Sequence, residues 1–174
     1  LDYVGLEERW GGLKIEIKKK RLLSGMGKIN MINGGVDRLI MAEQLAYMLC
    51  RLAGIHVGIS EPIRLESDDH TLGVYLLVEQ PNRTFLKRNG LNGDGNLYKI
   101  LWYERSLVRK HEKKTHLTTG HQDLRNLNRE LNATTGKKQW DIIRQHFDVE
   151  EVINYFAVNM VLSHWEDRKS TRLN

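Results

Sequence analysis

The sequence contains a single cysteine and no long hydrophobic run. Because Cys50 stands alone among 174 residues, an internal disulfide framework and a multi-cysteine metal site are both excluded. Its apolar neighbours predict a thiol in the core. No stretch approaches the roughly 18 consecutive apolar residues that a membrane-spanning helix needs. We therefore expect a soluble globular chain without a membrane span.

Charge of one sign is only in modest excess. The 27 Lys and Arg residues against 22 Asp and Glu give a formal net charge of +5. This balance suits a polyanion such as a nucleotide, a nucleic acid or an acidic lipid, but it is also common among ordinary proteins. No known nucleic-acid-binding motif accompanies the charge, so we expect no nucleic-acid partner.

Two segments near the N-terminus have the two-residue period of a strand with one buried face. Residues 13–20 read "LKIEIKKK", in which apolar and charged residues alternate. Residues 27–34 read "GKINMING" and end at glycine. The two segments are predicted to be paired strands.

The pattern changes to helical spacing at Asp37. Apolar residues recur every three or four positions up to Leu52, and Asp37 can cap the first turn. Gly54 lies where a left-handed C-cap glycine belongs. The sequence therefore predicts a helix that begins at Asp37.

The next segment predicts a hairpin and a short helix. Residues 62–81 place the turn formers "ESDDHTLG" before "GVYLLVEQ", an apolar strand that Pro81 ends. A short helix is expected over residues 82–88. The glycine-rich "NGLNGDGNLYKI" is expected to be a loop that leads into another strand.

The C-terminal part predicts helices and loops. Residues 102–140 are basic and polar, so mixed helix and loop is expected there. Asp148 and Glu151 have capping-box spacing and open a helix whose broad apolar face predicts burial. The element order indicates an α+β fold, with a small antiparallel sheet and one helix followed by a helical region.

Glu43 carries the most chemical information. Its carboxylate lies within the apolar stripe of the predicted helix. Burying an unpaired charge costs on the order of several kcal/mol, so a cation is expected from the sheet. Lys28 is the natural candidate, with Lys14 and Lys18 behind it. The alternative is a structural ion pair, or a glutamate that reaches solvent at the edge of the stripe.

A strand lysine paired with a glutamate on the following helix is how protein kinases hold the phosphates of a nucleotide. The letters "EQPN" (residues 79–82) follow the predicted hairpin, where a connector between two lobes would present backbone groups to adenine. A strand that simply ends at a proline is the alternative interpretation of the same letters.

Three segments in register resemble the spore coat protein H (CotH) kinase family, an atypical branch of the protein-kinase-like fold. They read "DRLIMAEQLAYMLCRLAGIHV" (residues 37–57), "GVYLLVEQPNRTFLKRNG" (73–90) and "GDGNLYKI" (93–100). The resemblance extends from about Gly12 to Trp165 and is weakest over residues 101–140. It implies a protein-kinase-like N-terminal lobe followed by an incomplete helical lobe.

The resemblance also implies an activity and a site. The implied reaction is phosphoryl transfer from ATP, with Mg²⁺ or another divalent metal, to Ser or Thr of a protein substrate. Glu43 would be the family's helix glutamate, and Lys28 its lysine, although Lys14 could fill that place. Glu79 and Gln80 would lie at the lobe connector. A spore-coat or cell-surface location would agree with the resemblance.

The last residues depart from the family pattern. The helix that ends in "SHW" should be followed by a catalytic aspartate and, shortly afterwards, an asparagine, but Glu166 stands in the aspartate position. Reverse translation of "DRKSTRLN" (residues 167–174) resembles a sequencing-library adapter, and a hybrid codon would turn a natural Asp into Glu166. The alternative is a genuine hydrophilic C-terminus. The adapter interpretation predicts a fragment that lacks its metal ligands and does not catalyse phosphoryl transfer alone.

We therefore expect residues 1–100 to form a nucleotide-facing lobe, residues 101–166 to begin a helical lobe, and residues 167–174 to be a non-native tail. Two other functions stay open. One is a non-catalytic coat or surface protein that keeps the kinase-like fold for binding partners. The other is a polyanion-binding module, whose affinity would fall steeply with salt.

Overall fold

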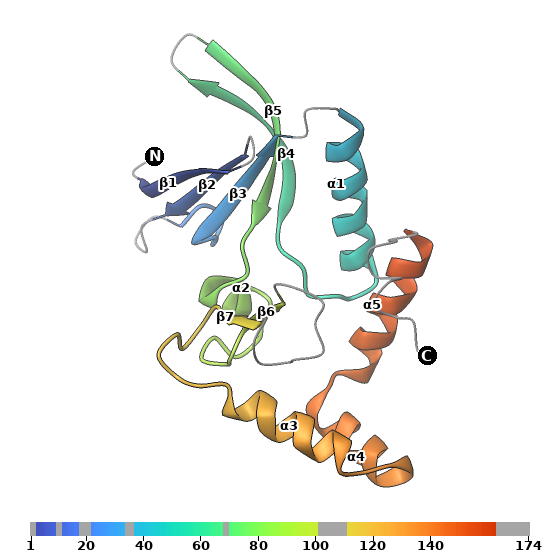
Figure 1. The fold of residues 1–174 in the computed structure, drawn as a ribbon. Helices are drawn as coiled ribbons and strands as arrows, with labels where there is room; N and C mark the ends of the chain where they lie inside the picture. The colour runs from blue at the N-terminus through green and yellow to red at the C-terminus, as the bar shows by residue number, and fades with distance from the viewer. Residues whose placement is uncertain are drawn as a thin grey trace. The chain divides into compact units, whose positions relative to one another are not determined.

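The computed structural model has the predicted α+β architecture and describes residues 3–9, 12–17, 22–33, 37–67, 70–100 and 111–162 (Figure 1). The chain forms two compact units. The first comprises residues 1–52 and 56–95, and the second comprises residues 53–55 and 96–174. Among the described residues, no helix is long and apolar enough to cross a membrane.

The first unit is built on a five-stranded antiparallel sheet with the order β1-β2-β3-β5-β4. Both N-terminal strand predictions are confirmed, because β2 pairs with β3 in the register Leu13↔Met31. A strand that the sequence did not predict, β1, pairs with the free edge of β2. The strands are β1 (Tyr3–Arg9), β2 (Gly12–Ile17), β3 (Lys28–Asn33), β4 (Ser60–Ser67) and β5 (His70–Glu79).

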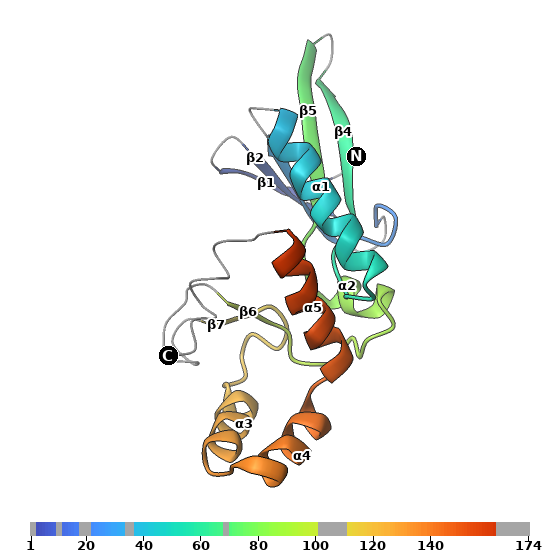
Figure 2. The ribbon, with the colours of Figure 1, turned by 90° about the vertical axis from the view of Figure 1, so that its right-hand side faces the viewer.

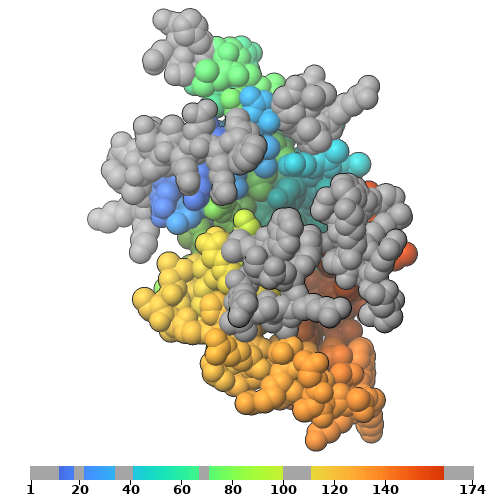
Figure 3. All heavy atoms as spheres, viewed as in Figure 1, coloured from blue at the N-terminus to red at the C-terminus, as the bar shows by residue number. Residues whose placement is uncertain are grey.

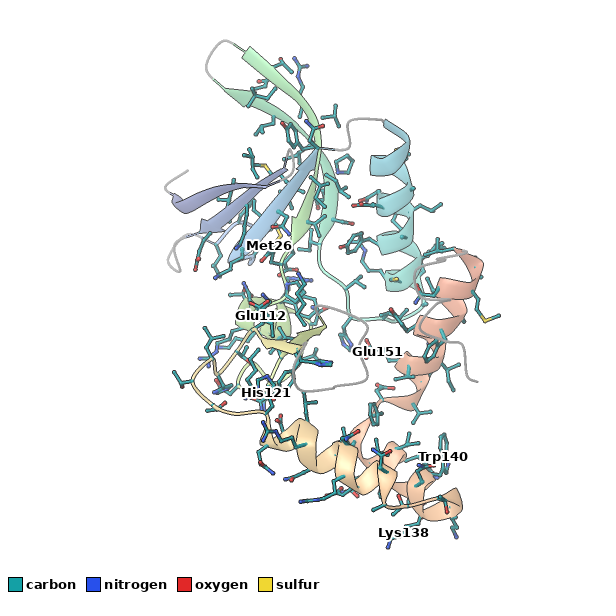
Figure 4. All side chains as sticks on the ribbon, viewed as in Figure 1. Met26, Glu112, His121, Lys138, Trp140 and Glu151 are labelled. Carbon is teal, nitrogen blue, oxygen red and sulfur yellow. The ribbon has the colours of Figure 1, made fainter. Side chains whose placement is uncertain are left out.

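A tight turn brings the chain into β3. Leu23 and Met26 form an isolated antiparallel bridge, and the two residues between them both have positive φ, 48° at Ser24 and 82° at Gly25. Positive φ at both central residues is the signature of a type I′ turn, which matches the twist of antiparallel strands. Met26, labelled in Figure 4, is buried directly after this turn.

The two faces of the sheet carry separate apolar clusters. One cluster consists of Ile17, Met26, Ile29 and Leu77. On the other face, Leu76 and Val78 pack with Ile32 and with Tyr47 of α1 (Asp37–Leu52). The helix begins at Asp37 as predicted, and Figure 2 shows it lying along the sheet. One face of the sheet is therefore the α1 face.

The predicted hairpin is confirmed as β4 and β5, but it reaches beyond the sheet. Only the second half of β5, from Tyr75 to Glu79, pairs with β3, while among the described strands its first half pairs with β4 alone. The register shifts between Leu65 and Glu66, and Gly73 has a φ of 118°. Figure 1 shows this pair of strands projecting past the neighbouring strands.

The first unit closes with the short helix α2 (Arg83–Arg88), which was expected over residues 82–88. Asn82 caps it by accepting hydrogen bonds from the backbone N–H groups of Thr84 (2.8 Å) and Phe85 (3.1 Å). Phe85 and Leu86 are buried. The cap and the apolar pair fix α2 immediately after the end of β5.

The described part of the second unit contains a small two-stranded sheet and three helices. Asp148 caps α5 by accepting the N–H of Glu151 at 3.0 Å, as the capping-box spacing predicted. In Figure 3 the outer surface of α4 is seen in orange, and Figure 4 labels its half-exposed Trp140. The elements are β6 (Tyr98–Ile100), β7 (His111–Lys113), α3 (Gln122–Asn132), α4 (Gly136–His146) and α5 (Val149–Val161).

The prediction that α5 is largely buried is wrong. Tyr155 and Phe156 are 43% and 48% exposed, and Val161 is 75% exposed. Asn154 holds the helix to the start of the unit by donating a hydrogen bond to the carbonyl oxygen of Ala53, at 2.9 Å. The prediction from the broad apolar face overestimated the burial of α5, because no described element of the second unit packs closely over that face.

Candidate functional site

Lys28 is the first residue of β3 and lies on the α1 face. Alternation along the strand places Lys28 and Asn30 on the same face as Ile32, which packs, as Tyr47 of α1 does, against the cluster of Leu76 and Val78. Lys14 of β2 is the cross-strand partner of Asn30 and therefore lies on this face too. Both predicted lysines thus belong to the α1 face, on which the helix packs against β4 and β5.

The predicted ion pair between Lys28 and Glu43 is not formed. Lys28 Nζ lies 3.1 Å from Glu16 Oε2, and both side chains are partly exposed. Glu16 is the direct cross-strand neighbour of Lys28, so it meets the lysine without any help from the helix. Within the part of the chain that the structure describes, no cation pairs with Glu43.

Glu43 shares one side of α1 with Tyr47 and Cys50. These residues are four and seven positions apart, so they lie along one helical face. Desolvation raises the pKa of the half-buried Glu43 carboxyl. Desolvation, followed by the nearby Glu43 and Cys50, raises the pKa of the Tyr47 hydroxyl, and desolvation raises that of the Cys50 thiol. Cys50 is only partly buried, so the predicted core thiol lies at the margin.

A buried serine at the start of β4 holds α1 against the sheet. Ser60 is 1% exposed, and its hydroxyl donates to Gln44 Oε1 at 3.0 Å. Ser60 Oγ also accepts a hydrogen bond from Arg51 Nη2 at 3.3 Å. Gln44 and Arg51 lie seven residues apart on α1, so a single serine holds the helix that carries Glu43 at two points about two turns apart.

The carboxylate of Glu79 is fully buried where β5 ends. It accepts hydrogen bonds from both Nε and Nη2 of Arg88, at the last position of α2. It also accepts the backbone N–H of Ile59 at 3.2 Å. The Glu79 side chain therefore joins β5, α2 and the segment before β4, and it does not point to solvent.

Gln80 ties the connector to β3. Its backbone N–H donates to the carbonyl oxygen of Lys28 at 2.9 Å, and its side-chain amide donates to Asn30 Oδ1. The Glu79 N–H donates to the carbonyl oxygen of Ile59 at 2.8 Å. The residues predicted at the connector therefore lie beside the strand that carries Lys28, and their amide groups are already bonded.

In the second unit, a polar cluster links α3 to the β6–β7 pair. Asp123 accepts hydrogen bonds from the Tyr98 hydroxyl at 2.6 Å and from the Asn96 amide at 2.7 Å. Lys113, 6% exposed, lies over the Tyr98 ring and donates to Thr119. Although desolvation opposes ionisation, the hydrogen bond from Tyr98 and the other polar contacts lower the pKa of Asp123. Desolvation and Asp123 raise the pKa of Tyr98.

The histidines of this region belong to the same structure. His121 stacks at a tilt on Tyr98, with 5.4 Å between ring centres, and its Nε2 lies 3.2 Å from the carbonyl oxygen of His111 (Figure 4). His121 is therefore held by contacts with both β6 and β7. No group of three or more potential metal ligands is present among the described residues. Glu166, the predicted catalytic position, and the tail after it lie outside those residues.

A family model described as CotH kinase protein matches residues 12–174. The chain belongs to the CotH kinase family. The match begins at β2 and includes β3, α1 and the connector, so every predicted site residue lies within it. A comparison with curated proteins found no match. Membership of the CotH kinase family makes this a kinase-like protein.

Sequence reasoning missed three residues that hold the elements around the candidate site together. Ser60, Thr84 and Arg88 each bond to a residue on another element. Arg88 lies nine positions after Glu79, and a carboxylate in an otherwise apolar strand was the available signal that a cation should be sought nearby.

Proposed function

We propose that this chain carries the nucleotide-facing lobe of an ATP-dependent protein kinase of the CotH type, which transfers a phosphoryl group to a Ser or Thr hydroxyl of a protein. The observation that carries the proposal is the α1 face of the sheet. Two lysines, Lys14 and Lys28, lie on this face, and the helix that packs against its β4 and β5 strands contributes Glu43, a half-buried carboxylate without a described cation.

In this proposal, Lys28 or Lys14 binds phosphate oxygens, and Glu43 orients the lysine. A lysine ammonium suits phosphate as a compact point charge. A half-buried carboxylate of raised pKa is stabilised in its ionised form by a nearby cation, which in this proposal is the ammonium of the lysine. Glu79 and Gln80 shape the connector with their side chains, because Glu79 is occupied by Arg88 and Gln80 by Asn30.

ATP supplies the transferred phosphoryl group, and a divalent metal would neutralise its phosphates. The described residues contain no set of carboxylates that fits such a metal. Catalysis therefore depends on groups outside the described part of the chain, and the lobe alone is expected to bind nucleotide without turning it over.

Replacing Lys28 by Met is expected to weaken ATP binding at least about tenfold, because a charge-assisted hydrogen bond to phosphate contributes ~1.5–3 kcal/mol. Methionine keeps an apolar stem of similar length and removes the charge. Isothermal titration calorimetry with ATP and Mg²⁺ measures the effect, and Lys14→Met tests the other candidate. Exposed Lys138 on α4, labelled in Figure 4, provides the control Lys138→Met.

Two results would count against the proposal. One is a wild-type chain that binds no ATP. The other is a chain whose affinity survives both lysine replacements unchanged. Protein binding that is independent of nucleotide would then favour the non-catalytic coat or surface protein.

Replacing Glu43 by Gln is expected to stabilise the fold at pH 7 while weakening ATP binding. Burial raises the pKa of Glu43, so its ionised form opposes folding at neutral pH. The expected rise in melting temperature is small, because Glu43 is only half-buried and solvent screens part of the cost of its charge. The ammonium that binds phosphate would at the same time lose its orienting carboxylate.

The pH dependence of the stability difference between the wild type and Glu43→Gln tests this explanation. The stability that protonation of Glu43 contributes is present below its unfolded pKa and is lost as the pH rises through its raised folded pKa. The advantage of Glu43→Gln should therefore shrink as the pH is lowered through that range. Thermal unfolding at several pH values measures this, and an advantage that grows on acidification would contradict it.

A further inference from the structure

The backbone on both sides of Lys28 is held by hydrogen bonds. Before it, the carbonyl oxygen of Gly27 accepts the N–H of Ile17 at 2.9 Å, and the Gly27 N–H donates to Thr84 Oγ1 at 3.1 Å. After it, the carbonyl oxygen of Lys28 accepts the N–H of Gln80 at 2.9 Å. Of these three contacts, only the one from Thr84 is made by a side chain.

The Thr84 hydroxyl is oriented for this contact. Its proton is donated to Asn82 Oδ1 at 2.6 Å, so a lone pair is left to accept from Gly27. Asn82 is fixed in turn, because the same oxygen caps α2. At its other end, α2 is anchored by Arg88 on the buried Glu79. The hydroxyl is therefore presented by a helix held at both ends.

The approach between Gly27 and α2 is close. Gly27 is buried, and a Cβ added to it would lie 3.2 Å from Thr84 Oγ1 and 3.4 Å from Thr84 Cγ2. Glycine thus allows the strand to meet α2 directly. This close contact joins two residues that are 57 positions apart in the chain.

We propose that Thr84 is a positioning residue for Lys28: its hydroxyl holds the Met26–Gly27 peptide, one residue before Lys28, and thereby limits the backbone motion of the lysine that presents its ammonium to phosphate. This inference rests on the proposed function. A lysine side chain is flexible, and any motion of its backbone adds to the range of positions that its ammonium occupies. Lys28 is the first residue of β3, where a strand frays most easily, and the contact from Thr84 lies at that end.

The test compares Thr84→Val, which removes the hydroxyl at nearly constant shape, with Thr84→Ser, which keeps it. Calorimetry measures the affinities for ATP with Mg²⁺ and for adenosine. Hydrogen exchange measures the opening of the Gly27 amide. The control is Thr134→Val, because the Thr134 hydroxyl makes one exposed hydrogen bond, to the carbonyl oxygen of Glu130, at 2.9 Å.

Thr84→Val is expected to weaken ATP binding about three- to tenfold, as loss of one oriented hydrogen bond does, and to change adenosine binding less than about twofold. Exchange at Gly27 should become faster. Thr84→Ser and Thr134→Val should both behave as the wild type. If Thr84→Val does not fold, Thr84→Ala replaces it in the same comparison.

The outcomes separate the two proposals. If the wild type binds ATP and Thr84→Val binds ATP with the same affinity, the positioning role alone is overturned. If Thr84→Val loses affinity for ATP and for adenosine equally, the positioning role is also overturned, because a merely structural residue has that effect. Failure of the wild type to bind ATP overturns the proposed function, and the positioning role with it.

Discussion

An Arg88→Ala variant is expected to have a free energy of unfolding about 3–5 kcal/mol below that of the wild type, which is the usual cost of removing one partner of a buried ion pair. The Glu79 side chain is 0% exposed, whereas Arg88 is 27% exposed. Removing the arginine leaves the carboxylate with one described hydrogen bond, from the N–H of Ile59. The cost arises from a buried charge without its cation.

Urea unfolding followed by circular dichroism measures this effect. Arg83→Ala is the matched control on the same helix, because Arg83 pairs with Asp94 at 3.2 Å and both side chains are more than half exposed. An exposed pair of this kind contributes only ~0–1 kcal/mol. Equal, small losses in the two variants would contradict the structural role assigned to Glu79.

Replacing Gly58 by Ala is expected to lower the free energy of unfolding by about 2–3 kcal/mol, toward the upper part of the range for overpacking. A Cβ at Gly58 would lie 2.7 Å from the carbonyl oxygen of Glu79. That oxygen belongs to the backbone at the end of β5, so it cannot rotate away as a side chain would. Relief requires β5 and the segment before β4 to separate.

Gly120→Ala is the control for this variant. A Cβ at Gly120 would meet no atom within 4 Å, and its backbone is not in the left-handed region. Alanine there is expected to be neutral or to stabilise the chain by up to ~1 kcal/mol. A Gly58→Ala variant that unfolds at the same urea concentration as Gly120→Ala would show that the end of β5 yields easily.

The elements with a clear period were predicted from the sequence, and those defined by tertiary contacts were not. The alternation in β2 and β3, the helical stripe of α1 and the turn formers between β4 and β5 all identified their structures. The strand β1 was missed, because "YVGLEER" has no regular alternation and its pairing depends on the free edge of β2. The α5 face was misjudged because amphipathic breadth does not say whether a neighbour covers it.

The sequence proposed residues for the candidate site but not their contacts. The roles of Lys28 and Glu43 stay predictions, and the pattern could not foresee that Glu16 would pair with the lysine from the adjacent strand. The bond between Gly27 and Thr84 joins residues far apart in the sequence, and no local pattern encodes it. Whether Lys28 or Lys14 meets phosphate stays a prediction.

The two halves of β5 are paired differently, so we expect them to differ in local stability. From Tyr75 onward β5 is bonded on both sides and its side chains are buried, whereas Leu72 and Val74 in the first half are about half exposed. An isolated two-stranded ribbon is only marginally stable in water. Local melting should therefore be confined to the residues of β5 before Gly73 and their partners in β4, and a protease could cut this part of the ribbon while the half beside Lys28 keeps its place.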